Sequence, residues 1–176
     1  MKYKEELDRA MEWLATKPNT VFMGQAIGFS GHAISNTMTK VPQDKRIELP
    51  VFEELQMGMA TGMALEGWVP ITCYPRFDFF ILGLNQLINH LDKIQYMSKG
   101  DMKPKVIIRV AVGSKHPVSA GPQHTQNHTE AIRKMLTEVN VIELCSTEHI
   151  FEAFVNAYNS DKSTLLIEHS EYYGTK

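Results

Sequence analysis

The sequence predicts an α/β protein with one mostly parallel β-sheet and helices on both faces of the sheet. Two observations lead to this fold class. Apolar, strand-like segments alternate with helical segments along the 176-residue chain, and several of the strand-like segments are continuously apolar. Continuous apolar strands joined by helices are typical of parallel sheets that are covered on both faces. The length suits one domain with a sizeable core, so we expect residues 1–176 to form a single domain.

The composition is that of an ordinary globular protein, with 43% hydrophobic and 22% charged residues. A net charge of -2 gives no basic field for nucleic acid or an acidic membrane. We find neither a signal-peptide pattern nor an apolar run near the roughly 18 residues of a membrane span. Cys73 and Cys145 lie far apart in apolar runs, so we expect buried, reduced thiols and a cytoplasmic protein.

The first third of the chain is predicted to hold a helix, a buried strand and a loop. Apolar residues recur three and four positions apart from Tyr3 to Ala15, which is the period of an amphipathic helix. Thr20–Ile27 is short, apolar and rich in β-prone residues, so we expect a strand. After it we expect a loop at Gly28–Gly31, a short helix at Ile34–Lys40 and an extended segment at Arg46–Phe52.

The central segment begins as extended chain and continues as a helix that contains two glycines. Pro50 biases the residue before it away from helix. Glu53 and Glu54 then place two carboxylates in a first helical turn, where the helix dipole favours them. Gly58 and Gly62 each cost this helix roughly 1 kcal/mol relative to alanine. We expect the close approach of another backbone or of a ligand to offset that cost.

The second half of the chain continues the alternation. Lys105–Val112 is the strongest predicted strand because β-branched residues dominate it. Phe77–Ser98 carries one apolar stripe at helical spacing, so we expect a long helix that buries Phe80, Leu84, Leu87, Ile88, Leu91 and Ile94. The remaining predicted elements are strands at Trp68–Tyr74, Val139–Leu144 and Ser163–His169, a helix at Glu130–Thr137 capped by Thr129, and a helix from Thr147 to Asn159.

Gly113–Thr129 interrupts this alternation as a long polar loop that contains His116, His124 and His128. A loop of this length in a compact domain is uncommon and is more often functional. Parallel sheets bind ligands outside the carboxyl ends of their strands. The loops that follow the predicted strands, this one included, therefore form the candidate site.

Six segments, in order, resemble the pyrimidine-binding domain of thiamine-diphosphate enzymes, and most closely the beta subunits of the 2-oxo acid dehydrogenases. The likeness covers nearly the whole chain. The segments are Pro50–Gly67 with its Pro-x-x-Glu and spaced glycines, Gly62–Pro70, parts of Phe77–Gly100, Ser119–Gln126, Val139–Cys145 and parts of Leu165–Gly174. Each segment alone is common, whereas the ordered set is specific. The resemblance implies a thiamine-diphosphate-binding fold of the pyrimidine-binding type.

The resemblance carries three residues over to the cofactor, and we expect Gln25, which departs from the family pattern, to contact the cofactor as well. Glu53 matches the glutamate that touches the aminopyrimidine ring, Phe79 the aromatic residue that packs on that ring, and His124 a histidine that faces the reacting centre. Gln25 stands where the family usually has an acidic pair, beside the same cofactor. Simpler interpretations are a solvated helix-start carboxylate for Glu53, core packing for Phe79 and a backbone-bonded loop histidine for His124. For His32, His116 and His128 we expect solvated surface positions.

The resemblance also implies the chemistry. The thiazolium carbon of the cofactor becomes the nucleophile after it loses a proton to the cofactor's own imino group. A carboxylic acid bonded to the far ring nitrogen drives formation of the imino tautomer, and it needs a raised pKa. Leu55, Met57 and Met59, which follow Glu53, could provide the apolar surroundings that raise it. Glu53 and His124 are therefore the expected catalytic residues.

The chain lacks the Gly-Asp-Gly…Asn motif that binds the diphosphate and metal in this family. We therefore expect none of its own residues to bind metal. Thiamine diphosphate and Mg²⁺ would be held mainly by a diphosphate-binding partner subunit, most economically in a heterotetramer. The apolar, methionine-rich faces around Met57–Met63 suit burial against such a partner.

The implied function is that of one subunit of a split enzyme that acts on a 2-oxo acid or ketose. It would cleave or form a carbon–carbon bond next to a carbonyl group. Dehydrogenase, transketolase-like and carboligase chemistry all remain open. Gln25, Ala26 and Pro75 depart from the family pattern near the expected substrate position. An alternative is therefore a non-catalytic partner or regulatory subunit that retains the fold.

Overall fold

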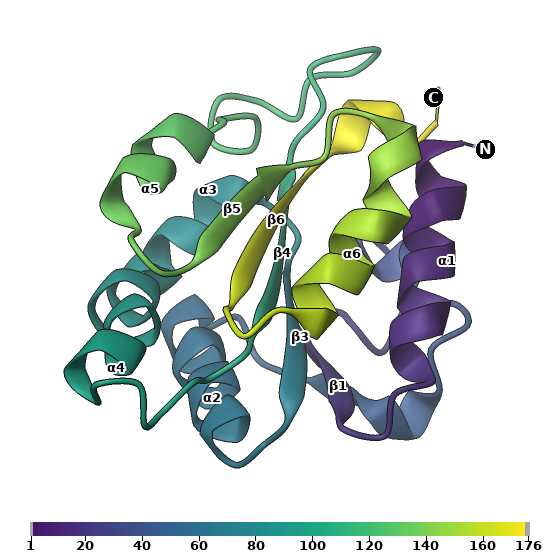
Figure 1. Ribbon diagram of the computed structural model, residues 1–176. Helices are drawn as coiled ribbons and strands as arrows, with labels where there is room; N and C mark the ends of the chain where they lie inside the picture. Colours follow the sequence, from purple (N-terminus) through teal and green to yellow (C-terminus); the bar gives the residue numbers. More distant parts are fainter. Residues whose placement is uncertain (1, 175–176) are drawn as a thin grey trace.

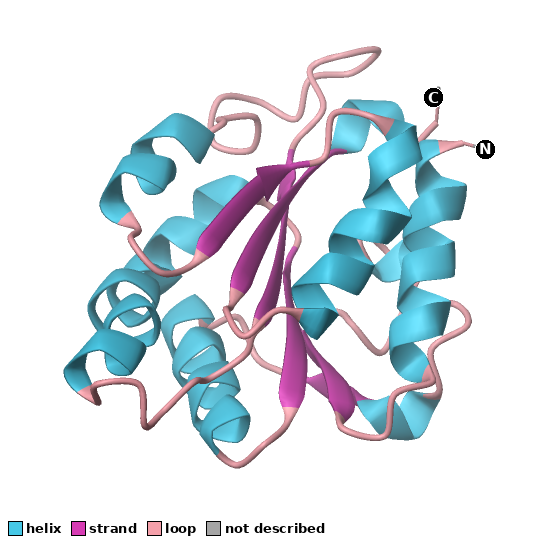
Figure 2. Cartoon of the chain, viewed as in Figure 1, coloured by secondary structure: helices cyan, strands magenta, loops and turns pink. Residues whose placement is uncertain are grey.

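The computed structural model describes residues 2–174 and confirms the predicted fold class (Figures 1 and 2). Within these residues, six strands form one sheet in the order β2-β1-β3-β4-β6-β5, and every neighbouring pair is parallel. The strands are β1 (Thr20–Gly24), β2 (Arg46–Glu48), β3 (Val69–Tyr74), β4 (Ile107–Val112), β5 (Asn140–Glu143) and β6 (Thr164–His169).

Helices cover both faces of the sheet, as Figure 1 shows. One face packs against α1 (Tyr3–Ala15) and α6 (Ile150–Asn159), and the other against α2 (Glu53–Leu65), α3 (Phe77–Phe80) and α5 (Thr129–Met135). A further helix, α4 (Asp92–Met97), follows a π-helical segment at Gln86–Leu91. The two layers enclose two separate hydrophobic cores, which we name the α1/α6 core and the α2/α5 core.

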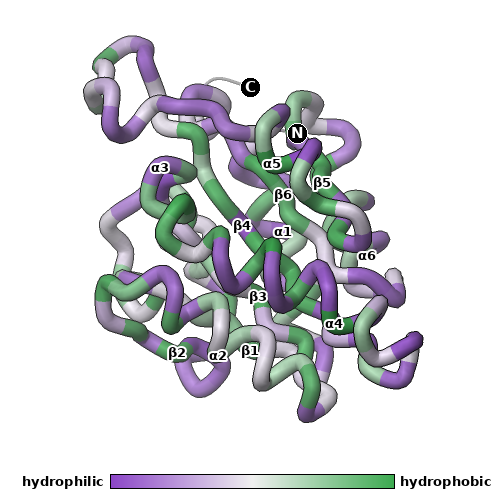
Figure 3. Tube along the Cα trace, turned by 90° about the vertical axis from the view of Figure 1, so that its left-hand side faces the viewer, coloured by the Kyte–Doolittle hydropathy of each residue, from purple (hydrophilic) through white to green (hydrophobic). Residues whose placement is uncertain are grey.

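Strand β4 shows why its sequence is continuously apolar. Ile107 and Ala111 pack into the α1/α6 core, whereas Ile108 and Val110 pack into the α2/α5 core. Successive side chains of a strand point to opposite faces, so a strand covered on both faces needs apolar residues at almost every position. Figure 3 shows hydrophobic colouring along β4 and β6 and mostly hydrophilic colouring in the loop that leaves β4.

The predicted helix at Phe77–Ser98 is confirmed in extent, because residues 77–97 are helical throughout, but it is not a regular α-helix. It contains α3, a 3₁₀ turn at Ile81–Gly83, the π-helical segment and α4. At Gly83 the segment passes so close to α2 that a Cβ would lie 3.3 Å from the Glu53 carbonyl oxygen. The apolar stripe follows the altered geometry. Phe80, Leu87 and Leu91 are buried, whereas Leu84, Ile88 and Ile94 are half-buried.

Several predicted boundaries also shift. β1 ends at Gly24 rather than Ile27, because Ala26 adopts a left-handed conformation with φ 53°. The expected helix at Ile34–Lys40 is only a 3₁₀ turn at Ser35–Thr37. α5 begins at Thr129, so Thr129 is the first residue of the helix and not its cap, and the Asn127 side chain accepts the Thr129 N–H at 3.0 Å. A 3₁₀ turn at Thr147–His149 precedes α6.

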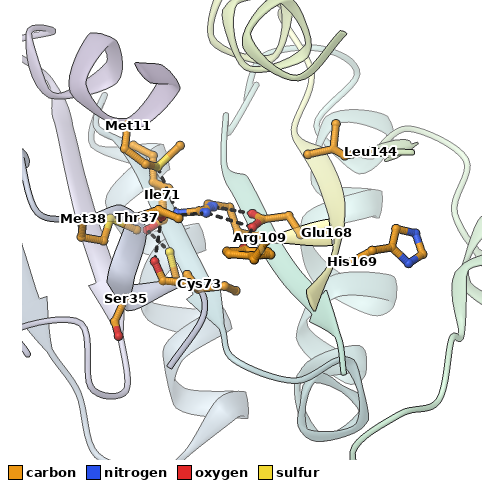
Figure 4. Close-up of polar contacts among 12 residues, drawn as sticks. Met11, Ser35, Thr37, Met38, Ile71, Cys73, Arg109, Leu144, Glu168 and His169 are labelled. Atoms are coloured by element: carbon orange, nitrogen blue, oxygen red, sulfur yellow. Dashed lines mark hydrogen bonds and ion pairs between the residues drawn. The ribbon is translucent and has the colours of Figure 1, made fainter. Parts of the chain in front are cut away.

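A fully buried ion pair lies in the middle of the sheet (Figure 4). Arg109 on β4 donates to both carboxylate oxygens of Glu168 on β6, at 2.6 and 3.0 Å. Arg109 also donates to Thr37 Oγ1 at 3.1 Å, and the Tyr173 hydroxyl donates to Glu168. Burial alone would lower the pKa of Arg109, but the Glu168 charge more than offsets this and raises it. The pair therefore links two strands, the turn before β2 and the C-terminal segment.

A second buried carboxylate organises the turn before β5. Asp92, at the start of α4, accepts the backbone N–H groups of Thr137, Glu138 and Val139 at 2.8 to 3.1 Å, and it pairs with Lys93 at 2.7 Å. Burial would raise the pKa of Asp92, but these bonds outweigh it and lower the pKa to about 2. The charged carboxylate of Asp92 thus holds in place the turn that leads into β5.

No helix in residues 2–174 combines the length and the apolar character that crossing a lipid bilayer would require.

We expect the stability of the protein to fall with acidification as Asp92 becomes protonated. Its pKa is lowered from about 3.8 to about 2, so the contribution is present above pH 4 and is lost between about pH 4 and pH 2. The shift corresponds to about 2 kcal/mol. Urea unfolding should show Asp92→Asn destabilised by about that amount at pH 7, with a smaller difference at pH 2. The exposed control Asp101→Asn should change stability little, and equal effects of the two variants would contradict this role.

Breaking the central ion pair should be costlier than replacing it. Arg109→Met leaves Glu168 buried without its counter-charge, which typically costs about 3–5 kcal/mol. In the double variant Arg109→Met/Glu168→Gln, no uncompensated charge remains, and Gln can still accept from Tyr173. We expect the double variant to regain a substantial part of the loss in urea unfolding. If the double variant is no more stable than Arg109→Met, the uncompensated charge of Glu168 is not the cause of the lost stability.

Candidate functional site

The candidate site lies at the edge of the sheet where the parallel strands end. β1 ends at Gly24 and β3 at Tyr74, and each is followed by a loop or helix that returns over this edge. α2 starts at the same edge, because it connects β2 to β3, which run in the same direction. The loop at 113–128 leaves β4 at this edge (Figure 1). The fold thus gathers all the sequence-predicted site segments on one side.

Glu53 and Glu54 open α2, as predicted, but they have different surroundings. Glu54 is half-buried and accepts from Asn85 at 3.2 Å and from Gln86 at 3.4 Å. Glu53 is only 6% exposed, and no hydrogen bond or ion pair within the described residues reaches its carboxyl group. Its backbone carbonyl accepts from the Tyr74 hydroxyl at 3.5 Å. The expectation of a solvated helix-start carboxylate therefore does not hold for Glu53.

The two glycines in α2 are not explained by packing inside the described chain. A Cβ at Gly58 would make only ordinary contact with Gln86, at 3.6 Å, and one at Gly62 would meet nothing within 4 Å. The expected approach of another backbone is therefore absent from residues 2–174. Met57 is fully buried in the α2/α5 core, so it does not form part of an outer face.

Phe79 and His124 contact each other. Their rings pack edge to face, with centroids 5.3 Å apart and planes at 82°, and both side chains are half-buried. A second link joins the same two segments, because Gln126 donates to Asp78 at 2.7 Å. Two residues that were assigned to one site from distant parts of the sequence therefore lie together. Phe79 is therefore not a fully buried core residue. The ring of His124 contacts an aromatic side chain, which the simpler interpretation of a backbone-bonded loop histidine did not include.

Gly113 makes this arrangement possible, and sequence reasoning missed it. A Cβ at Gly113 would lie 1.8 Å from the His124 carbonyl oxygen. No other residue fits where the loop returns so closely over the end of β4. The available signal was a glycine placed directly after the strongest predicted strand.

Gln25 follows β1 in a loop that is held by backbone contacts. Glu48, at the end of β2, accepts the N–H groups of Ala26 at 2.6 Å and Gly28 at 2.8 Å. The Gln25 carbonyl oxygen accepts from His32 Nε2 at 3.2 Å. The half-buried side chain of Gln25 makes no hydrogen bond within the described residues. Its position at the site edge agrees with the prediction, and its contact with a cofactor stays a prediction.

His32 is not a solvated surface residue, contrary to expectation. It is half-buried, and its Nδ1 accepts the Ser35 N–H at 3.2 Å while its Nε2 donates to Gln25. Burial lowers the pKa of His32, and the nearby charge of Arg76 lowers it further. These contacts require the neutral tautomer with its proton on Nε2.

The other two histidines of the loop differ from each other. His116 is exposed, as expected. His128 is half-buried against Phe77, with ring centroids 5.5 Å apart, and its Nε2 is buried without a hydrogen-bond partner in the described residues. The surface prediction for His128 is therefore wrong, because the loop folds back onto α3.

Arg76 is a second residue that sequence reasoning overlooked. It follows β3 directly, donates to the Pro75 carbonyl at 2.7 Å, and has a buried Nε without a hydrogen-bond partner among the described residues. It makes no ion pair within residues 2–174. A cation with unused donors at this edge can receive an anionic group.

A cleft of about 640 Å³ opens between the loop that follows β4 and the end of β6. Its lining includes Gly113, Lys115, Thr125, His128 and His169. The sequence-predicted residues Glu53, Phe79, Gln25 and His124 do not line it. The cleft and the predicted cofactor residues are therefore different places on the same edge.

Cys73 and Cys145 differ as well. Cys73 is buried, as expected, and burial raises the pKa of its thiol to about 12. Cys145 is exposed, which contradicts the prediction. It lies in the turn that follows β5, an edge strand of the sheet, so only one side of this strand has a neighbouring strand.

Comparisons with known proteins agree with this fold. The family described as "Transketolase, pyrimidine binding domain" matches residues 2–175. Pyruvate dehydrogenase E1 component subunit beta of Rickettsia felis is 29% identical over 175 residues, which is 97% of this chain and 53% of the relative. The same subunit of Cyanidium caldarium is 27% identical over 179 residues, which is 98% of this chain and 53% of the relative. The chain thus spans about half the length of these relatives.

Solved structures show the same fold at lower identity. A split-gene transketolase, described as an inactive beta4 tetramer, has a TM-score of 0.69 at 16% identity and covers 96% of this chain and 51% of its own. Transketolase from Campylobacter jejuni has a TM-score of 0.74 at 16% identity and covers 94% of this chain and 25% of its own. With the family match over nearly its full length, this chain belongs to the transketolase pyrimidine-binding domain family.

Proposed function

We propose that this chain is the pyrimidine-binding subunit of a split thiamine-diphosphate-dependent enzyme that cleaves or forms a carbon–carbon bond next to a carbonyl group. The observation that carries the proposal is the state of Glu53, which is buried at the start of α2 without a hydrogen-bond partner in the described residues. Its carboxyl oxygens are not among the enclosed polar atoms of residues 2–174 that lack a partner, so they still reach the surface of the site edge. A ligand there can bond to Glu53 without displacing a contact within the described residues.

The other sequence-predicted residues at this edge of the sheet suit the pyrimidine end of thiamine diphosphate. Phe79 offers an aromatic ring that is only partly covered, and His124 is held against it. Gln25 has an amide without a hydrogen-bond partner in residues 2–174. These side chains provide one acid, one stacking surface and polar groups that orient a ring, as a heteroaromatic ligand requires.

Each side chain has a distinct role in this proposal. Thiamine diphosphate, when bound, supplies the carbon nucleophile that attacks the substrate. Glu53 holds and exchanges a proton at the pyrimidine nitrogen. Phe79 fixes the plane of the pyrimidine ring. His124, positioned by Gly113 and by its contact with Phe79, donates or accepts a proton near the reacting carbonyl.

The diphosphate and Mg²⁺ are assigned in this proposal to a partner subunit. The start of α2 supports such an interface, because several large apolar side chains there and in the adjacent turn are exposed, namely Val51, Phe52, Leu55, Met59, Ile81 and Leu82. A patch of this kind beside a functional residue is typical of a protein–protein contact. Gly62, with open space beside it, lies on the same helix. We propose a heterotetramer of two such chains and two diphosphate-binding chains.

The substrate class is a 2-oxo acid or a ketose. Arg76 supports an anionic substrate, because it is a cation without an ion-pair partner in residues 2–174, at the edge that carries the candidate site. Its guanidinium can bind a carboxylate or a phosphate. This choice leaves dehydrogenase, transketolase-like and carboligase reactions within the proposal.

A non-catalytic partner or regulatory subunit is the second candidate function. The observation in its favour is the loop after β1, where Gln25 and Ala26 replace the acidic pair that the family usually has, and where Glu48 from β2 accepts the Ala26 N–H. In this case the fold would be retained for assembly alone.

The first prediction concerns Glu53→Gln, assayed with the diphosphate-binding partner present. Gln keeps the size of the side chain but cannot exchange a proton, so we expect turnover to fall by roughly 10²–10⁴-fold. Glu54→Gln is the matched control. It removes only contacts to Asn85 and Gln86, and we expect near-normal activity. An active Glu53→Gln enzyme with a normal circular dichroism spectrum would refute the role of Glu53.

The second prediction concerns cofactor binding, measured by calorimetry with Mg²⁺. We expect thiamine diphosphate to bind when the partner subunit is present and not to bind to this chain alone. Phe79→Ala should weaken that binding roughly tenfold through lost ring packing. Tyr96→Ala, at an exposed ring on α4, is the control and should have no effect.

Two calorimetric results would count against the proposal. Absence of binding with the partner would favour the non-catalytic alternative. Tight binding to this chain alone would contradict the assignment of the diphosphate to a partner.

A further inference from the structure

The register of β5 and β6 brings three potential metal ligands together at the carboxyl edge. The strands are parallel, and Glu143 is paired with Ile167. β5 ends at Glu143, and Cys145 follows in the turn, where its Sγ lies 4.0 Å from His169 Nε2. Ile167 and His169 are two apart in β6 and share a face, so Glu143 and His169 point to the same side of the sheet, and Cys145 reaches that side from the turn.

The neighbours of these residues confirm the alternation. Leu144 packs into the α1/α6 core on the opposite face, and Glu168 points to that face as well, where it meets Arg109. Figure 4 shows the His169 ring directed away from the Arg109–Glu168 pair. The three side chains are therefore presented at the edge and do not take part in the buried network.

The distances between the three ligand atoms suit one bound ion. His169 Nε2 lies 3.0 Å from Glu143 Oε1 and 4.0 Å from Cys145 Sγ, and one ligand atom from each residue lies within 4.8 Å of the others. Around a tetrahedral Zn²⁺ ion, nitrogen and oxygen ligands are about 3.3 Å apart, and nitrogen and sulfur about 3.6 Å. Shifts of about half an ångström would bring each of these two contacts to its coordination distance, and the carboxylate and the thiol, within 4.8 Å of each other, must also move closer together.

We propose that Glu143, Cys145 and His169 form a site for a thiophilic divalent cation, Zn²⁺. Zn²⁺ takes thiolate, imidazole and carboxylate ligands alike, whereas hard cations such as Mg²⁺ take the carboxylate but not the thiolate. The thiolate and the carboxylate together carry two negative charges, which neutralise the ion. With three protein ligands, the fourth position remains open, and His169 also lines the 640 Å³ cleft.

Further contacts hold the ligands in place, as second-shell partners do in metal sites. Asn127 donates to Glu143 Oε1 at 2.8 Å, and the ring of Tyr172 packs on that of His169 with centroids 5.2 Å apart. The backbone N–H of His169 donates to the Tyr3 hydroxyl at 3.2 Å. On binding, the ion takes the place of the proton between His169 and Glu143, and Cys145 binds as the thiolate.

The test is a titration of the full chain, without a histidine tag and after treatment with a chelator, with Co²⁺ as a spectroscopic substitute for Zn²⁺. Thiamine diphosphate and Mg²⁺ are left out, so the result does not depend on the proposed function. We expect saturation at one equivalent, with intense visible d–d bands of a tetrahedral ion and a near-ultraviolet thiolate-to-cobalt band. Addition of Zn²⁺ should remove both.

Variants separate this site from any other. Cys145→Ser should abolish the thiolate band, and His169→Asn should weaken binding roughly tenfold or more. His90→Asn, at an exposed histidine on the π-helical segment, is the control and should titrate like the wild type. Circular dichroism establishes that each variant is folded.

Two results would overturn the site. One is a wild-type chain without a stoichiometric thiolate band. The other is a thiolate band that persists in Cys145→Ser, since the sulfur ligand would then be Cys73.

Discussion

The buried pair between Arg109 and Glu168 is the interaction on which one half of this structure depends. It places two opposite charges in the core between the sheet and the α1/α6 layer, where each is tolerable only with the other present. Arg109 also reaches Thr37, and the hydroxyl of Tyr173 donates to Glu168. The loop after β1 and the C-terminal segment are therefore fixed to the same point. The loop after β1 also contains Gln25 and His32. The Arg109–Glu168 pair therefore helps to hold part of the candidate site in place.

The site edge shows how a parallel sheet concentrates function. Every strand ends on the same side, so loops far apart in the chain must share a small area. This edge carries the partnerless Glu53 and, beyond the central strands β3 and β4, the Phe79–His124 contact, which support a cofactor subunit completed by a partner. At the β5 end of the sheet, the register of β5 and β6 produces a different cluster around His169. One topological rule thus accounts for two chemically distinct places.

Much of the fold could be predicted from local sequence, because it depends on local physics. Helix α1 and strand β4 are predicted closely, from the amphipathic period of Tyr3–Ala15 and the β-branched residues of Ile107–Val112. The spacing of apolar residues along a segment indicates whether one face or both faces of that element are buried. The failures occur where tertiary contact overrides propensity. The helix expected at Phe77–Ser98 departs from α-helical geometry around Gly83, where it meets the backbone of Glu53. Cys145 is exposed in the turn that follows β5, an edge strand, and strand order is not visible in composition.

By itself, the sequence determined the fold class, the family resemblance and the residue types at the candidate site, because spacing along the chain carries this information. Only the tertiary structure decided that Glu53 is buried and partnerless while Glu54 is bonded, since both are helix-start carboxylates in the sequence. It also decided which distant side chains meet, such as Phe79 with His124. Contacts between loops depend on how strands are ordered and registered, and that order follows from packing of the whole sheet rather than from any one segment.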